Sequence, residues 1–155
     1  AVYSDCERYR YSLSRVWDSA GSKVLFVMLN PSKATEAAND PTVERCERRA
    51  RALGFGAFQV SNIFAWRETS PPLMRKAQAP VGADDDTVFL QAGAWADTVI
   101  AAWGTHGANL GRGPAVKGLL RNQCIPMFHL VLSKDGHPKH PLYISYAQQP
   151  VAWLD

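Results

Sequence analysis

The sequence lacks the patterns that mark several common classes of protein. Its three cysteines, Cys6, Cys46 and Cys124, lie far apart and form no C-x-x-C pair, which argues against a zinc cluster and a disulfide framework. It has neither a G-x-G-x-x-G fingerprint nor a Walker loop, so the usual phosphate-binding loops are not indicated. The longest apolar run, residues 24–29, is far too short to span a bilayer. We therefore expect no metal, no cofactor and no membrane partner.

The sequence also has little excess of charge. A net charge of +3 and a pI near 8.9 permit an anionic partner such as nucleic acid or a nucleotide without requiring one. Free thiols fit a reducing compartment, and the charged residues Asp5, Glu7 and Arg8 leave no signal peptide visible near the start. We therefore expect a cytoplasmic protein, and the sequence leaves its oligomeric state open.

Buried strands and helices alternate along the chain. With 155 residues, of which 46% are hydrophobic, it suits one domain over 1–155 with a core of its own. A half-exposed strand is expected over 9–17. Continuous apolar runs then predict buried strands at 23–29, 57–64, 98–103 and 127–132, with helices at 40–53, 84–96 and 114–122. This order predicts an α/β fold, a three-layer αβα sandwich whose mainly parallel four-stranded sheet carries an N-terminal strand or hairpin.

The first predicted helix has two distinct faces. Asp40 and Pro41 open it with an N-cap and a first-turn proline. The face of this helix opposite its apolar residues carries four arginines, which are either solvated or available to phosphates: Arg45, Arg48, Arg49 and Arg51.

Ligands of parallel sheets bind at the carboxyl ends of the strands, so the residues that follow each strand are the candidates for a site. The first strand ends in Asn30-Pro31-Ser32, where the Asn30 carboxamide could hold a water or a base edge, or only form an Asx turn. Asn62 interrupts the second apolar strand. A buried asparagine needs hydrogen-bond partners, so it either reads a base edge or bonds to neighbouring backbone.

Further candidates follow the second and third strands. Phe64 could stack on a base or belong to the core, and Arg67 could clamp a phosphate or pair with Glu68. Trp103 and Gly104 end the third strand, where glycine lets the backbone approach a ligand closely.

The loop after the fourth strand carries His137, Lys139 and His140. These residues could present a cation or a proton donor to a developing anion, or they could belong to an ordinary surface loop. The H-x-x-H spacing hints at a metal, but no neighbouring cysteine or carboxylate cluster supports one.

Taken in order, four segments resemble the uracil-DNA glycosylase superfamily. They are Leu29-Asn30-Pro31-Ser32, the strand ending in Val60-Ser61-Asn62, the strand ending in Trp103-Gly104, and residues 137–142 with their His-Pro and Pro-Leu pairs. Ser32 stands where that superfamily usually has glycine.

The resemblance implies a role for several residues. Asn30 would position the attacking water, with Pro31 and Ser32 beside it at the substrate. Asn62 would read the base edge, and His140, or His137, would stabilise the departing base anion. Leu142 would enter the duplex in place of a flipped base.

A second resemblance extends over nearly the whole chain. The segments that carry it are similar to a mainly bacterial family of unknown function, domain of unknown function 1643, and they bring no established activity: 9–17, 28–32, 40–42, 62–67, 103–107 and 138–143.

Three functions remain open at this stage. The first is hydrolysis of the N-glycosidic bond of a base in nucleic acid or in a nucleotide. The second is a non-catalytic nucleic-acid or nucleotide-binding module. The third is an interaction domain in which the strand ends are only turns.

Overall fold

The computed structural model describes residues 2–3, 10–29, 40–64, 85–104, 107, 111–141 and 144–153. Helices and strands alternate over most of this part of the chain, so the expected α/β class is confirmed. The elements follow the order β1 (Val2–Tyr3), β2 (Arg10–Val16), β3 (Lys23–Met28), α1 (Pro41–Ala52), β4 (Ala57–Asn62), α3 (Asp85–Trp95), β5 (Thr98–Ala101), α4 (Arg112–Asn122), β6 (Phe128–His129) and β7 (Val151–Ala152).

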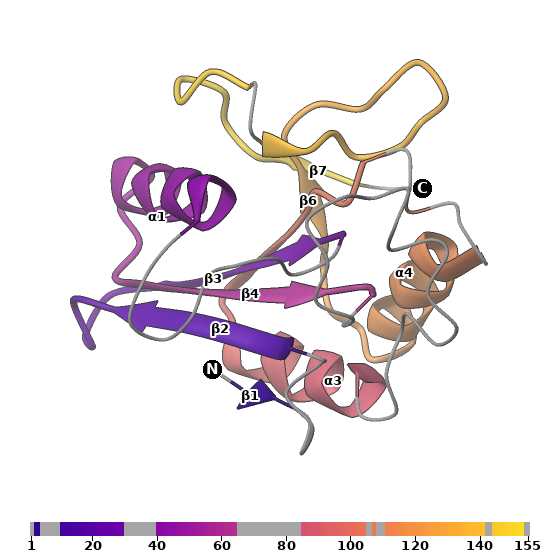
Figure 1. The fold of residues 1–155 in the computed structure, drawn as a ribbon, viewed down its shortest axis with the longest axis horizontal. Coiled ribbons are helices and arrows are strands. Elements are labelled where there is room, and N and C mark those ends of the chain that lie inside the picture. Colours follow the sequence, from indigo (N-terminus) through magenta and orange to yellow (C-terminus); the bar gives the residue numbers. More distant parts are fainter. Residues whose placement is uncertain are drawn as a thin grey trace.

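The strands form one mixed sheet that is larger than expected (Figure 1). It has seven strands in the order β1-β2-β4-β3-β5-β6-β7. The four strands β4, β3, β5 and β6 run parallel to one another. At one side β2 and β1 add antiparallel strands, and at the other side β7 pairs antiparallel with β6. The expected N-terminal strand thus belongs to an antiparallel pair, and the strand β7 was not expected.

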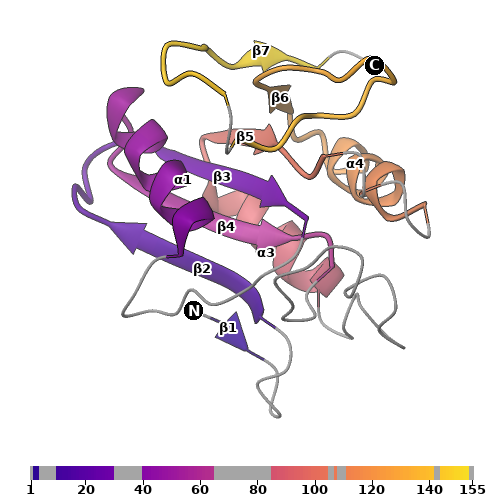
Figure 2. The ribbon, with the colours of Figure 1, turned by 45° about the horizontal axis from the view of Figure 1, so that its top comes forward.

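Helices cover both faces of this sheet (Figure 2). Successive side chains of β3 point to opposite faces, and five consecutive residues, 24–28, are buried, as in a strand covered on both sides. On one face Val24 and Phe26 pack with Val43 and Cys46 of α1.

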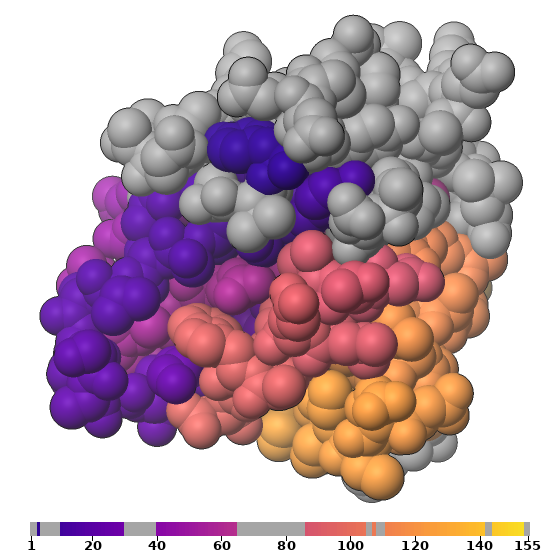
Figure 3. Space-filling view, turned by 90° about the horizontal axis from the view of Figure 1, so that it is seen from below, coloured from indigo at the N-terminus to yellow at the C-terminus, as the bar shows by residue number. Residues whose placement is uncertain are grey.

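On the other face Leu25 and Val27 pack with Phe89 of α3 and with Val116 and Leu120 of α4. Figure 3, seen from below in Figure 1, shows the salmon side chains of α3 lying over this face.

Two strands differ from the expected patterns. The half exposure predicted for the first strand is wrong at its start, because Arg10–Leu13 are buried between β1 and β4 and Tyr11 packs on Val88 of α3. The fourth parallel strand is shorter than predicted. Beyond β6, Leu132 pairs with Pro138 as an isolated bridge, so the chain turns back there.

Within the described ranges, no helix is both long enough and apolar enough to cross a bilayer.

Candidate functional site

The carboxyl ends of the four parallel strands lie at one edge of the sheet. Asn62 ends β4, and Trp103 and Gly104 follow β5. The turn after β6 joins them there, because the Gly104 N–H donates to the Pro138 carbonyl over 2.7 Å. Gly104 has a φ of +74°, which glycine adopts without strain. Two of the expected segments, 103–104 and 137–140, therefore come together at this edge.

Asn62 has an unusual environment. The residue is 1% exposed, and its Oδ1 atom has no hydrogen-bond partner among the residues that the structure describes. Asn62 lies opposite Met28 of the neighbouring strand β3. It is on the same face of β4 as Phe58 and Val60, which pack in the core under α1. A buried acceptor without a partner costs about 1–3 kcal/mol. Such a group in a folded protein requires an explanation, and a ligand that donates a hydrogen bond is one.

Phe64 and Trp103 lie inside the core cluster between the sheet, α3 and α4. Phe64 is fully buried and Trp103 is 3% exposed. The Trp103 indole packs against two glycines, and a Cβ atom added at Gly113 would lie only 2.8 Å from its Nε1. Their burial favours the packing role that the sequence left open for Phe64, and it leaves neither ring face open to a stacked base.

His140 directly precedes a residue whose carbonyl is bound by α1. The Arg45 Nε of that helix donates to the carbonyl of the next residue, Pro141, over 3.3 Å. Burial lowers the pKa of His140 below its ordinary value, and the negative charge of Asp40 opposes this shift. The imidazole is therefore neutral at pH 7, able to donate from one ring nitrogen and to accept at the other.

His137 and Lys139 belong to the turn after β6. The His137 N–H donates to Ser133 Oγ over 3.1 Å, and the His137 carbonyl accepts from the Ser133 N–H. Lys139 is exposed, and its N–H donates to the Val131 carbonyl. His137 is thus fixed by the turn itself and His140 by α1. No group of three potential metal ligands occurs among the residues that the structure describes.

The other predicted site residues lie outside the described residues, and they stay predictions: Asn30, Pro31, Ser32, Arg67 and Leu142.

Arg112 stabilises the end of β4 and was not expected there. The Arg112 Nε donates to the carbonyl of Ile63, directly after Asn62, over 2.7 Å, and the Arg112 guanidinium pairs with Asp86 of α3 over 2.7 Å. The Arg112 side chain is only 9% exposed. This residue therefore ties both helices of that face to the strand end that carries Asn62. Its partner on β4 is a main-chain carbonyl, which has no signature in the sequence.

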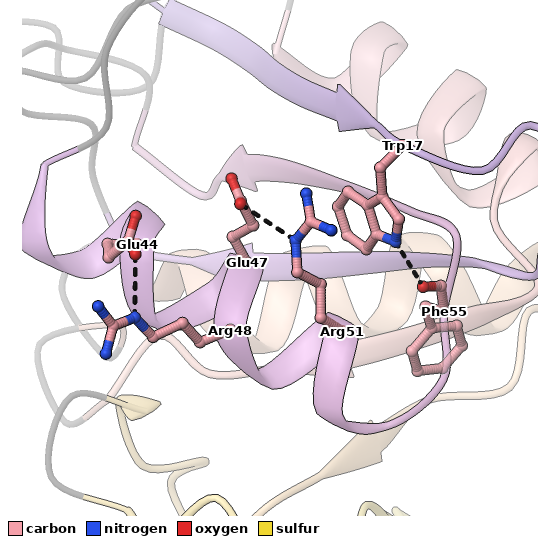
Figure 4. Close-up of polar contacts among 6 residues, drawn as sticks. All are labelled: Trp17, Glu44, Glu47, Arg48, Arg51 and Phe55. Carbon is pink, nitrogen blue, oxygen red and sulfur yellow. Dashed lines mark hydrogen bonds and ion pairs between the residues drawn. The ribbon is translucent and has the colours of Figure 1, made fainter.

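The arginines of α1 divide into two pairs. Arg48 and Arg51 are exposed and pair with Glu44 and Glu47 (Figure 4). Arg51 also lies over the ring of Trp17, 4.1 Å from its centroid.

The expectation that the whole arginine face meets solvent or phosphates is wrong for the other two, Arg45 and Arg49. Both donate to main-chain carbonyls, those of Pro141, Ile144 and Ser145, and Arg49 is fully buried.

Two other titratable groups, one buried and one partly buried, are poor candidates for chemistry at this site. Burial raises the pKa of the Cys46 thiol to about 12, so Cys46 is no thiolate nucleophile at neutral pH. His129, whose pKa is lowered by burial, faces Trp153 with 6.2 Å between ring centroids, and Trp153 in turn lies 5.7 Å from Trp103. His129 therefore belongs to the side of the sheet covered by α3 and α4, away from α1.

The lowered pKa of His140 predicts how stability depends on pH. Between the ordinary value near 6.5 and the lower folded-state pKa, the unfolded chain binds a proton at His140 that the folded chain does not. The free energy of unfolding should therefore fall on acidification from pH 7 to pH 5, and His140→Gln should show a smaller fall. Urea unfolding at both pH values measures this difference. Identical pH dependence in the two proteins would contradict the environment described for His140.

Comparison with known proteins gives a family and no activity. No curated protein and no solved structure matches the chain. The model of a family described as a protein of unknown function, DUF1643, matches residues 10–142. This range includes β2, the parallel strands β3, β4, β5 and β6, the helices α1, α3 and α4, and the strand ends discussed above. The chain therefore belongs to the DUF1643 family.

Proposed function

We propose that this protein hydrolyses the N-glycosidic bond of a base, in nucleic acid or in a nucleotide, at the carboxyl ends of the parallel strands. The observation that carries the proposal is the buried Asn62 Oδ1 at the end of β4, which has no partner in the described part of the chain. A carboxamide combines a hydrogen-bond acceptor with two donors on one planar group, and this pattern complements the edge of a nucleobase. A bound base would supply the missing donor to Asn62.

His140 suits the second requirement of such a reaction, which is stabilisation of the departing base as an anion. A neutral imidazole held near the strand ends can donate a hydrogen bond where negative charge develops. Its burial keeps it neutral at pH 7. Asn30 would position the attacking water and Leu142 would replace a flipped base, as the resemblance implies.

A uracil-DNA-glycosylase-like fold is part of this proposal. Its support is topological: each of the four resembling segments lies at the end of, or directly after, a different one of the parallel strands β3, β4, β5 and β6. Parallel strands bring such segments to one edge, where α/β sheets bind ligands. Since one fold serves many functions, the activity itself rests on Asn62 and His140.

A base-release experiment tests the proposal. The protein is incubated with single- and double-stranded oligonucleotides that carry uracil, thymine mismatches, hypoxanthine or alkylated bases, and released base is measured by mass spectrometry. We expect release by the wild type and none by Asn30→Ala or His140→Ala, with unchanged circular dichroism. Binding without release, weakening as salt rises because phosphate contacts release counterions, would instead indicate a non-catalytic nucleic-acid-binding module.

A further inference from the structure

Two arginines of α1 bind the chain directly after His140. Arg45 Nε donates to the Pro141 carbonyl over 3.3 Å, and Arg45 Nη2 donates to the Ile144 carbonyl over 2.7 Å. Arg49 Nη2 donates to the same Ile144 carbonyl over 2.7 Å, and Arg49 Nη1 donates to the Ser145 carbonyl over 3.0 Å. The ring of Tyr146 lies over both guanidinium groups: its centroid is 4.4 Å from Arg45 Cζ and 5.3 Å from Arg49 Cζ.

The start of the same helix carries a negative charge that acts on His140. Asp40 is the N-cap of α1, where its Oδ1 accepts from the Val43 N–H over 2.8 Å, and its charge acts on the His140 imidazole. One helix therefore supplies the carboxylate near the imidazole and the guanidinium groups that bind the following chain. Of the two arginines, only Arg45 donates to the carbonyl of Pro141, the residue directly after His140.

We infer that Arg45 is a positioning residue, which holds His140 in its partly buried place near Asp40 by binding the carbonyls of Pro141 and Ile144. The significance of this for catalysis rests on the proposed function, because the role of His140 belongs to that proposal. The placement of the His140 imidazole by Arg45 does not depend on the proposed function.

The planar guanidinium group is what this role requires. Arg45 donates from two nitrogens to two carbonyls three residues apart, a geometry that the rigid fork of arginine supplies and the single ammonium group of lysine does not. Lysine preserves the positive charge at this position, so Arg45→Lys separates the geometry from the charge.

The test is the pKa of His140, measured by NMR titration of the histidine ring signals in the full chain. In Arg45→Lys the side chain of residue 45 can keep only one of its two hydrogen bonds to the carbonyls of Pro141 and Ile144. We therefore expect the imidazole to become more hydrated and its pKa to rise toward the ordinary value. Arg45→Met should raise it as well. Asp40→Asn should lower it, because the N-cap remains while the nearby negative charge disappears.

Arg48→Met is the matched control. It removes one positive charge from the same helix, but Arg48 is exposed and pairs with Glu44, so we expect the pKa of His140 to stay at its wild-type value. His129, on the other side of the sheet, should keep its own pKa in every variant and serves as the internal reference. Amide spectra establish that each variant is folded, and Arg45→Lys carries the test if Arg45→Met unfolds.

An unchanged His140 pKa in folded Arg45→Lys and Arg45→Met would overturn the inference. A rise in Arg45→Met alone would also overturn it, because the charge and not the guanidinium geometry would then be responsible. The titration needs no substrate. A His140 pKa that shifts in the Arg45 variants, with no base release by the wild type, would support the positioning role and refute the proposed function. Base release by the wild type, with an unchanged His140 pKa in the Arg45 variants, would support the proposed function and refute the positioning role.

Discussion

Asn62→Leu is expected to slow base release about a hundredfold or more while leaving the free energy of unfolding unchanged or increased. Among the described residues, buried Asn62 Oδ1 has no partner, so its removal relieves an unfavourable interaction worth about 1–3 kcal/mol, and leucine has the same branched arrangement of side-chain heavy atoms. Losing two hydrogen bonds to a base, at about 1.4 kcal/mol each, should slow release about a hundredfold or more. Urea unfolding and the base-release assay measure the two effects separately.

Val60→Ala is the matched control for Asn62→Leu. Val60 lies on the same face of β4 and is buried in the same core, but it presents no polar atom to a ligand. Truncating a buried aliphatic side chain should cost about 1–3 kcal/mol of stability while base release persists in the folded protein. The opposite result for Asn62→Leu, a large loss of stability with release intact, would make Asn62 a structural residue.

Gly113→Ala is expected to destabilise the protein by about 2–3 kcal/mol, as overpacking in a tight core does. The added Cβ would lie 2.8 Å from Trp103 Nε1 and 2.9 Å from the Gly107 carbonyl oxygen. Neither can retreat easily, because Trp103 is buried in the core and the carbonyl belongs to the main chain. Thermal and urea unfolding should both show the loss.

Gly118→Ala tests the same chemical change on the same helix. A Cβ added there meets nothing within 4 Å, so the helix propensity of alanine should dominate and stabilise the protein by up to about 1 kcal/mol. If both alanine variants were equally stable, the close packing of Trp103 against α4 would not exist as described.

The parts of the fold that could be predicted are those with a regular pattern of their own. The apolar runs at 23–29 and 57–64 indicated buried strands, and Asp40 and Pro41 marked the start of α1. The strands β1 and β7 have two residues each, which is too short for any periodicity to show. Their place in the sheet depends on pairing with distant residues.

The candidate site was predictable to a similar extent. A polar residue inside an apolar strand pointed to Asn62, and its burial is found. The sequence could not distinguish His140 from His137, because the difference lies in their partners: α1 for one and the turn after β6 for the other. It also could not show that Arg45 binds carbonyls 96 and 99 residues further along the chain. Main-chain carbonyls are the same at every residue, so nothing in the sequence marks them as partners.

Base release from the oligonucleotide panel, compared between the wild type and Asn62→Leu, tests the central claim most directly. We predict that the wild type releases at least one base and that Asn62→Leu, folded and at least as stable, releases it about a hundredfold more slowly or not at all. Equal release by the two proteins, or none by the wild type from any oligonucleotide, would contradict the claim that the carboxyl ends of these strands bind a base and cleave its N-glycosidic bond.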